Sequence, residues 1–200
     1  GSGVTYRPAG NYNGPDSFNY VISDGHGGQA TGTVSVTVTA VNDVPVAWND
    51  SLTLAEDSSA TAVAVLANDT DADLDALRVA SVTQGARGAV VITGGGTGLT
   101  YQPAANYNGS DIFTYAVTDD HGGWDTGSVC VTVSAVNDTP VAQAQSVSTL
   151  ENAPLAITLA GTDADGDALS YQVMSGPGKG SLQGTAPCLV YVPAANTNGA

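Results

Sequence analysis

Two short acidic runs place carboxylates at alternate positions of the chain: Asp71, Asp73 and Asp75, then Asp163, Asp165 and Asp167. Alternate acids at the start of a loop are typical of sites for hard divalent cations, because carboxylate oxygens are the ligands that Ca²⁺ prefers. Neither run begins an EF-hand, because position twelve is Val82 in one and Met174 in the other, where that motif has glutamate. Each run therefore supplies part of a site, and the other oxygens must come from elsewhere in the fold.

Further acidic and amide residues recur in register with these runs. Glu56, Asn42-Asp43 and Asp119 have counterparts at Glu151, Asn137-Asp138 and Asp24. A solvated acidic turn explains one such loop, but it explains this recurrence poorly. Two carboxylates about 5 Å apart repel by about 3 kcal/mol at an effective dielectric near 20, so converging acids favour a cation between them. Hard oxygen ligands in flexible loops predict Ca²⁺ as that cation.

The acidic residues belong to a long internal repeat. Val41-Asn-Asp-Val-Pro45 returns as Val136-Asn-Asp-Thr-Pro140, an offset of 136 − 41 = 95 residues. The segment Tyr6–Gly14 returns as Tyr101–Gly109, and a degenerate third copy stands at residues 191–199. Such a period predicts a tandem array. We expect residues 44–138 to form a complete repeat, residues 1–43 the C-terminal part of one before it, and residues 139–200 the N-terminal part of one after it.

Alternating apolar residues predict the strands that carry these motifs. Val34, Val36 and Val38 alternate with Ser35 and Thr37, which is the pattern of a half-buried strand. The complete repeat is predicted to hold seven strands, near residues 47–54, 61–66, 77–83, 89–93, 99–102, 112–118 and 127–136. Seven short strands and no helix favour an all-β immunoglobulin-like sandwich. Its expected core is Leu66, Leu77, Val79, Leu99, Tyr101, Phe113, Tyr115, Val117, Val129, Val131 and Val133.

The incomplete repeats carry the same signals. Strands are expected near residues 17–23 and 31–41 in the first, and near 147–149, 157–159, 169–174 and 189–192 in the last. Cys130 and Cys188 alternate with the apolar positions of their strands, so both should face outward, and their redox state stays undecided. The prolines at positions 45 and 140 predict stiff connections between repeats, since proline fixes φ and holds the residue before it extended.

The charge balance narrows the range of partners. The chain has 19 Asp and Glu against 4 Lys and Arg, a net charge of −15. This argues against nucleic acid and anionic lipid, which both need a basic surface. The acids gather at predicted strand ends, which indicates cation binding, although a salt-adapted surface is an alternative. No apolar run of about twenty residues and no signal peptide occur, so no membrane insertion is predicted.

No arrangement of residues predicts catalysis. His26 and His121 occupy the same place in a glycine-rich hairpin, with no Cys or Glu at ligand spacing, and are interpreted as turn residues. No Ser-His-Asp, Cys-His or Gly-x-Ser-x-Gly arrangement is present, so the chain is predicted not to be an enzyme. Trp48 and Trp124 align with glutamine in neighbouring repeats, so the core does not require them. Trp124 could stack on a sugar or simply pack at the surface.

Four motifs carry a family resemblance: residues 67–73, 100–109 and 23–28, and the Val-Asn-Asp-x-Pro segments. They resemble the bacterial cadherin-like repeats found in tandem in large secreted RTX-type adhesins, sometimes grouped with VCBS repeats. The resemblance covers essentially the whole chain. It implies tandem immunoglobulin/cadherin-like Greek-key β-sandwiches in a bacterial protein that is secreted or on the cell surface.

The resemblance also implies calcium sites where repeats meet. The first would gather Asn42, Asp43, Asp71, Asp73 and Asp119, with Asp16 as a further candidate. The second would gather Glu56, Asp111, Asn137, Asp138, Asp163 and Asp165. Asp75 and Asp167 are weaker candidates. Leu74 replaces the glycine found at Gly166, and Asp119-Asp120-His121 replaces Asp24-Gly25-His26. The first site is therefore expected to depart further from the family geometry.

The function expected is that of a calcium-stiffened structural segment, which lets an adhesin span distance. Its partners would be the adjacent repeats of the same chain and an unknown cell-surface or glycan ligand. Two alternatives remain: a carbohydrate- or protein-binding module, marked by Trp48 or Trp124, and an ancillary module of a secreted hydrolase. Because residues 1–43 supply late strands and residues 139–200 supply early ones, we also hypothesise head-to-tail self-association of the 200-residue chain.

Overall fold

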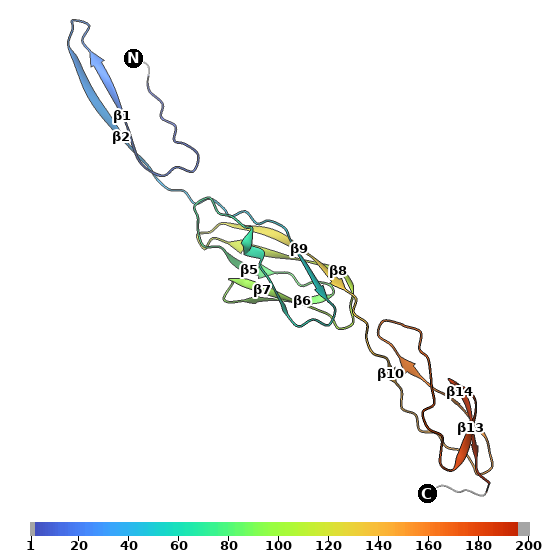
Figure 1. Cartoon of the computed structure of the whole chain (residues 1–200). Coiled ribbons are helices and arrows are strands. Elements are labelled where there is room, and N and C mark those ends of the chain that lie inside the picture. Colours follow the sequence, from blue (N-terminus) through green and yellow to red (C-terminus); the bar gives the residue numbers. More distant parts are fainter. Residues whose placement is uncertain (1–2, 196–200) are drawn as a thin grey trace. The chain divides into compact units, whose positions relative to one another are not determined.

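A computed structural model describes residues 3–195 (Figure 1). The chain divides into two compact units, residues 1–134 and 135–200, and each is taken by itself below. The first unit contains a hairpin followed by a complete sandwich. The second contains only short sheets. No helix among the described residues is long and apolar enough to cross a membrane.

The hairpin consists of β1 (Gly14–Ser23) and β2 (Gln29–Val38), which pair in antiparallel fashion with Phe18 opposite Val34. Both strands were predicted. Residues 4–8 belong to no assigned strand. Phe18, Tyr20 and Ile22 fall on one face of β1 because side chains alternate along a strand.

The complete repeat is a two-layer sandwich. Its strands are β3 (Asp50–Ala55), β4 (Thr61–Val63), β5 (Arg78–Val82), β6 (Gly88–Thr93), β7 (Gly98–Pro103), β8 (Gly109–Thr118) and β9 (Trp124–Ser134), with one 3₁₀ turn, η1 (Val65–Ala67). One sheet has the order β3-β9-β8-β5 and the other β4-β7-β6. All seven predicted strands are therefore confirmed, as is the all-β class.

The core lies between the two sheets. The Tyr101 and Phe113 rings stack with centroids 5.9 Å apart and planes 8° apart. Nine of the eleven predicted core residues are buried, and the other two, Leu66 and Leu77, pack against them partly buried. Leu54, Val63, Val65 and Val90 complete the buried set. Gly88 is required beside Tyr101, since a Cβ there would approach the ring to 2.3 Å.

The pairing of β3 with β9 fixes where the chain enters and leaves the sandwich. These two strands are parallel, with Asp50 beside Val129 and Ala55 beside Ser134. The chain therefore enters at the end of the pair where β3 starts and leaves at the opposite end, where β9 stops. An eleven-residue strand such as β9 spans about 35 Å at 3.3 Å per residue.

The second unit contains β10 (Val141–Ala142), β11 (Leu155–Thr158), β12 (Gly161–Thr162), β13 (Gly180–Thr185) and β14 (Cys188–Pro193). β10 pairs with β12, and β11-β14-β13 form a three-stranded sheet. The strands predicted near 157–159 and 189–192 are confirmed as β11 and β14. Cys130 and Cys188 are both exposed, free thiols, so the prediction that they face outward is confirmed.

The strands predicted at 147–149 and 169–174 are absent. Their counterparts in the complete repeat pair with β9 and β8. Residues 135–195 contain no corresponding hairpin, so these segments have no backbone partner. A strand needs such a partner for its N–H and C=O groups, whatever its apolar alternation.

We expect Phe113→Ala to lower the free energy of unfolding of the sandwich by about 3–5 kcal/mol, because it leaves a cavity against Tyr101. Ile112→Ala is the matched control, since Ile112 is the next residue on the opposite face and is 58% exposed. The control should change stability by less than about 1 kcal/mol. Urea unfolding of both variants measures the difference, and equal losses would contradict the assigned core.

Candidate metal centre

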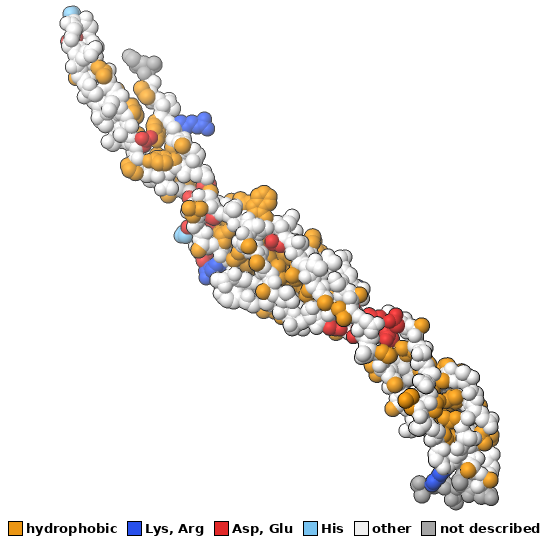
Figure 2. Space-filling view, viewed as in Figure 1, with side chains coloured by type: hydrophobic (Ala, Val, Ile, Leu, Met, Phe, Trp, Pro, Cys, Tyr) orange, Lys and Arg blue, Asp and Glu red, His pale blue; other side chains and the backbone are white. Residues whose placement is uncertain are grey.

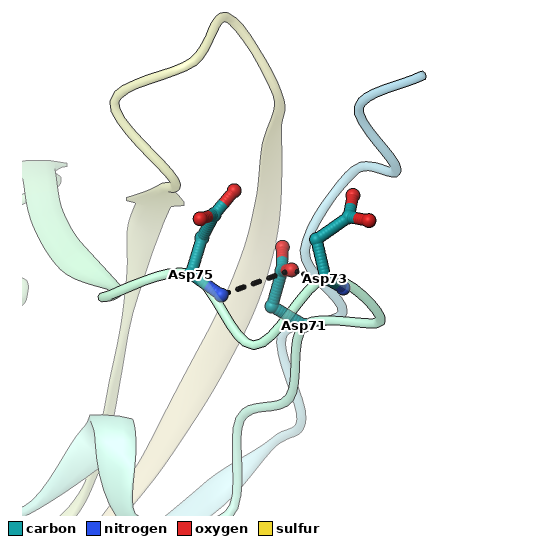
Figure 3. Close-up of side chains that lie close together, drawn as sticks. All are labelled: Asp71, Asp73 and Asp75. Atoms are coloured by element: carbon teal, nitrogen blue, oxygen red, sulfur yellow. Dashed lines mark hydrogen bonds between the residues drawn. The ribbon is translucent and has the colours of Figure 1, made fainter. Parts of the chain in front are cut away.

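The acidic run at Asp71, Asp73 and Asp75 forms one compact turn. One carboxylate oxygen from each lies within 4.8 Å of the other two. Figure 3 shows the three side chains projecting to the same side of the loop. The backbone N–H groups of Asp73 and Asp75 donate to Asp71 Oδ1 over 2.8 and 3.3 Å. Asp71 Oδ2 is buried and has no hydrogen-bond partner, which makes it the oxygen best placed for a cation.

Leu74 adopts the backbone conformation expected of glycine. Its φ is +66°, and Gly166 in the second acidic loop has a φ of +78°. Leu74 N–H donates to Asp71 C=O over 3.3 Å, and Gly166 N–H donates to Asp163 C=O over the same distance. The leucine side chain, 90% exposed, therefore leaves the loop's hydrogen bonds unchanged.

The linker before the sandwich is hydrogen-bonded to this turn. Asp43 N–H donates to Asp73 Oδ2 over 2.7 Å, and Asn42 Nδ2 donates to Asp119 Oδ2 over 2.7 Å. Asp119 is only 1% exposed, in the hairpin between β8 and β9. The hydrogen bond from Asn42, followed by those from the hairpin backbone, holds the pKa of Asp119 below its usual value. His121 Nδ1 lies 3.0 Å from Asp75 Oδ2, which connects the same hairpin to the acidic turn.

The five residues predicted for the first site thus form one connected set, and Asp75 joins them. Asp16 lies outside it. Its Oδ2 accepts a hydrogen bond from the Tyr6 hydroxyl over 2.8 Å, and its Oδ1 accepts one from Ser17 N–H over 2.7 Å. The hydrogen bond from Tyr6 contributes most to lowering the pKa of Asp16.

The second acidic run repeats this arrangement within its own unit. One oxygen each from Asp163, Asp165 and Asp167 lies within 4.8 Å of the others. Asp165 and Asp167 N–H donate to Asp163 Oδ1 over 3.0 and 3.2 Å. Asp138 N–H donates to Asp165 Oδ2 over 2.6 Å, as Asp43 does to Asp73 in the first set. Asn137 Nδ2 donates to Asp138 C=O over 2.8 Å.

Glu56 and Asp111, also predicted for the second site, lie in the sandwich. Glu56 follows β3, is buried, and donates its N–H to Ser134 C=O over 2.9 Å. Asp111 is buried and accepts four hydrogen bonds, from the Tyr101 hydroxyl at 2.8 Å and from three backbone N–H groups, those of Ala86, Arg87 and Ile112. Protein donors therefore surround the Asp111 carboxylate, and its geometry gives no support to a role as a metal ligand. The Tyr6–Asp16 hydrogen bond is the same contact, 95 residues earlier.

A second group of acids beside the linker escaped the sequence analysis. Asp125 Oδ2 accepts the N–H of Ala47 over 2.9 Å, and Asp69 Oδ1 accepts that of Trp48 over 2.8 Å. The Tyr115 hydroxyl lies 3.0 Å from Asp69 Oδ1. Burial is the largest cause that raises the pKa of Asp69 and of Asp50. These acids hold the start of the sandwich in place. Asp69 is marked in the sequence, because it begins the alternation that continues through Asp71, Asp73 and Asp75, whereas Asp50 and Asp125 stand outside that run.

The surface offers little else that could bind a ligand. Figure 2 shows few basic side chains on the visible face, and Arg78 is paired with Asp120. Trp48 and Trp124 are 57% and 69% exposed. Neither lines the grooves of about 820, 350 and 260 Å³ found among the described residues.

The fold and the repeated linker contacts define a chain of repeats, of which β3–β9 form a complete immunoglobulin-like sandwich. The chain belongs to the bacterial Ig domain family, which it matches over residues 1–37, 42–132 and 137–200. None of the curated proteins compared with the chain matches it.

Several solved structures are similar to the chain. An endo-fucoidan hydrolase of glycoside hydrolase family 107 shares 18% identity over 94% of this chain and 31% of its own, with a TM-score of 0.40. Mouse clustered PcdhgC3 EC1-3 shares 14% over 91% of this chain and 66% of its own, with a TM-score of 0.44. Protocadherin gammaB7 EC3-6 shares 13% sequence identity over 94% of this chain and 52% of its own, with a TM-score of 0.46. The chain thus spans under a third of the hydrolase's length.

We expect Leu74→Gly to raise the free energy of unfolding by about 0.5–1 kcal/mol in the presence of chelator. The left-handed conformation costs leucine about 1–2 kcal/mol, which exceeds the backbone entropy that glycine loses on folding. Ala72→Gly, in the same loop without a positive φ, is the control and should lower stability. Urea unfolding that ranks the two variants the other way would contradict the loop geometry.

We expect stability in chelator to rise as the pH falls from 7 toward the raised pKa values of Asp50 and Asp69. A carboxyl whose pKa is higher in the folded state binds protons more tightly there, so protonation stabilises the fold. The pKa of Asp119 is lowered in the folded state, so its protonation destabilises the fold. That loss of stability occurs only at lower pH, as the pH falls toward the folded-state pKa of Asp119. Asp69→Asn should flatten the rise, and unfolding curves at a series of pH values measure it. An unchanged slope would show that burial of Asp69 does not cause the effect.

Proposed function

We propose that this chain is a structural segment of a large bacterial surface or secreted adhesin, and that Ca²⁺ bound at its linkers stiffens it. One observation carries the proposal. In both linkers the N–H of the aspartate in the Asn-Asp pair donates to the middle carboxylate of an aspartate triad, at 2.7 Å for Asp43 and 2.6 Å for Asp138. The position of each linker is thereby tied to a cluster of negative charge.

The residues present fit a hard cation. Each triad offers only carboxylate oxygens, and Asp71 Oδ2 is buried without a hydrogen-bond partner. At 4.8 Å, a pair of such charges repels by about 1 kcal/mol in water and about 3 kcal/mol at an effective dielectric of 20. Each triad contains three such pairs, and their repulsion lowers a free energy of unfolding that is only about 5–15 kcal/mol for a small domain. A divalent ion supplies the charge that offsets this repulsion.

Asp71, Asp73 and Asp75 would hold the first ion, with Asn42, Asp43 and Asp119 beside it. Asp163, Asp165 and Asp167 would hold the second, with Asp138 beside it, and Asn137 and Glu56 stay candidates from the family resemblance. An ion that draws each triad together also fixes the carboxylate that accepts the linker N–H. Pro45 and Pro140 follow within two residues and restrict the same backbone. A linker held in this way is stiff, and stiff linkers suit a segment that acts as a spacer.

The proposed location is outside the cell, at the surface or secreted. Membership of the bacterial Ig domain family and the net charge of −15 support it. Extracellular calcium-binding modules have affinities of about 10⁻⁴–10⁻³ M, matched to their surroundings. The proposal assigns no catalytic role to the chain. A glycan or cell-surface ligand of the whole adhesin is a further proposal, and no groove described above carries it.

Calorimetric titration with CaCl₂ should reveal two classes of site with Kd of about 10⁻⁴–10⁻³ M. Asp71→Asn should remove one class and Asp163→Asn the other. Glu151→Gln, which loses the same charge at an exposed position outside both triads, should leave both. At ten times Kd, the ion should add about 1.4 kcal/mol of stability per site. Absence of any heat, with a melting temperature that chelator does not move, would refute the calcium proposal.

A further inference from the structure

The outer face of the sheet β3-β9-β8-β5 carries a row of three side chains next to the β8–β9 turn. Trp124 of β9 lies opposite Thr118 of β8, and Thr118 lies opposite Arg78 of β5. Val117 and Val79, the chain neighbours of Thr118 and Arg78, are buried in the core, so the row faces away from it. Adjacent strands lie about 4.8 Å apart, so the Cα atoms of Trp124 and Arg78 are about 10 Å apart.

Asp120, in the turn between β8 and β9, belongs to the same group. Its N–H donates to Thr118 Oγ1 over 3.2 Å, and its carboxylate forms an ion pair with Arg78. The Thr118 hydroxyl donates to Gly123 C=O over 3.0 Å, which holds the turn against the strand. We call Arg78, Thr118, Asp120 and Trp124 the Trp124 patch. It presents an indole ring, a guanidinium group and a carboxylate on one exposed face of the sandwich.

The fold of the repeat does not require the three exposed members of the patch. In the neighbouring repeats the positions of Trp124, Asp120 and Arg78 are held by Gln29, Gly25 and Ser170. Gln29 lies opposite Ser23 in the β1–β2 hairpin, as Trp124 lies opposite Thr118. These three side chains are therefore particular to the sandwich between β3 and β9.

Stability does not account for them either. Asp120 has a φ of +60°, at a position where Gly25 has a φ of +74°. Residues with a side chain rarely adopt this left-handed conformation, so the carboxylate is placed there against a backbone preference. Its partner is Arg78, and an exposed ion pair of this kind adds little to stability. Backbone strain of this sort is concentrated at functional sites.

The chemistry of the patch matches a sugar ring. The face of an indole carries negative partial charge, so it stacks on the C–H groups of a pyranose. A guanidinium group only donates hydrogen bonds and a carboxylate only accepts them, and adjacent hydroxyl groups of a sugar do both. Trp124 lines none of the grooves found among the described residues. Stacking needs no groove, because one flat ring contacts another.

Charge and shape distinguish a sugar from other partners. Asp120 already balances the charge of Arg78, and the chain has a net charge of −15, so an anionic polysaccharide is repelled. Proline-rich peptides bind in grooves lined by several aromatic side chains, whereas the patch has one aromatic ring on an open face. A neutral carbohydrate fits both properties of the patch.

We propose that the Trp124 patch binds neutral glycans, with a pyranose ring stacked on Trp124 and its hydroxyl groups held by Arg78 and Asp120. The patch shares no residue with either aspartate triad, so this role is additional to that of a spacer. A single stacked ring leaves most of the glycan in water, so Kd should be on the order of 10⁻³ M.

Titration of the 200-residue chain with cellohexaose, mannohexaose, xylohexaose and laminarihexaose, in CaCl₂ and again in chelator, tests the site. Saturation-transfer NMR observes the sugar itself, so it also serves for variants that lack Trp124. At least one hexasaccharide should bind. Trp124→Gln should weaken that binding about tenfold or more. Arg78→Ser and Asp120→Gly should each weaken it about three- to tenfold.

These three variants introduce residues that neighbouring repeats already carry, so the sandwich should still fold, and urea unfolding checks this. Trp48→Gln is the matched control, because Trp48 is exposed outside the patch and Gln143 holds its position in the next repeat. It should leave the affinity unchanged.

The proposal is overturned if no hexasaccharide binds in either condition, or if Trp124→Gln binds as tightly as the unaltered chain. An equal loss in Trp48→Gln would also overturn it, as would tighter binding of heparin or polygalacturonate than of any neutral sugar. Binding of polyproline at Trp124, with no sugar bound, would assign the patch to a protein partner instead. The heat of calcium binding is measured separately, so failure here is distinct from failure of the calcium proposal.

Discussion

Repulsion among three carboxylates on a single turn is the constraint on which the linkers depend. In each triad the first aspartate accepts two backbone N–H groups of its own loop, and the second accepts the N–H of the linker aspartate. Those hydrogen bonds offset only part of the repulsion, because the charges stay within 4.8 Å of one another. In the proposed calcium-bound state, linker position and cation binding would therefore be two aspects of one electrostatic arrangement.

The sandwich supplies the rigid frame that this arrangement needs. Its two sheets bury each other's apolar faces, and Tyr101 connects them twice, by stacking on Phe113 and by donating to the buried Asp111. The same tyrosine–aspartate contact occurs before the sandwich, between Tyr6 and Asp16 of β1, so the contact belongs to the repeat and not to one copy of it. Among the described residues, the β1–β2 hairpin and the sheet β11-β14-β13 leave apolar side chains exposed, whereas the sandwich buries the corresponding side chains.

The features that depend on local sequence pattern could be predicted from the sequence alone. Apolar alternation located the seven strands, and the 95-residue period matched the hairpins register for register. Features that depend on non-local partners were not predictable in this way. Residues 147–149 and 169–174 carry the strand pattern but no strand, because nothing among residues 135–195 pairs with them. Asp111 looked like a metal ligand, yet Tyr101 and three N–H groups occupy its carboxylate. Asp69 lies inside the 67–73 motif, but nothing in that motif indicates that its carboxylate accepts the N–H of Trp48.

A crystal structure of the chain grown in calcium is the most direct test of the central claim. The account predicts an ion at each triad, with Asp71, Asp73 and Asp75 oxygens in one and Asp163, Asp165 and Asp167 oxygens in the other, at about 2.3–2.6 Å. It also predicts that Asp43 and Asp138 keep their hydrogen bonds to Asp73 and Asp165. Only water among these carboxylates, with the linkers released from the triads, would contradict it.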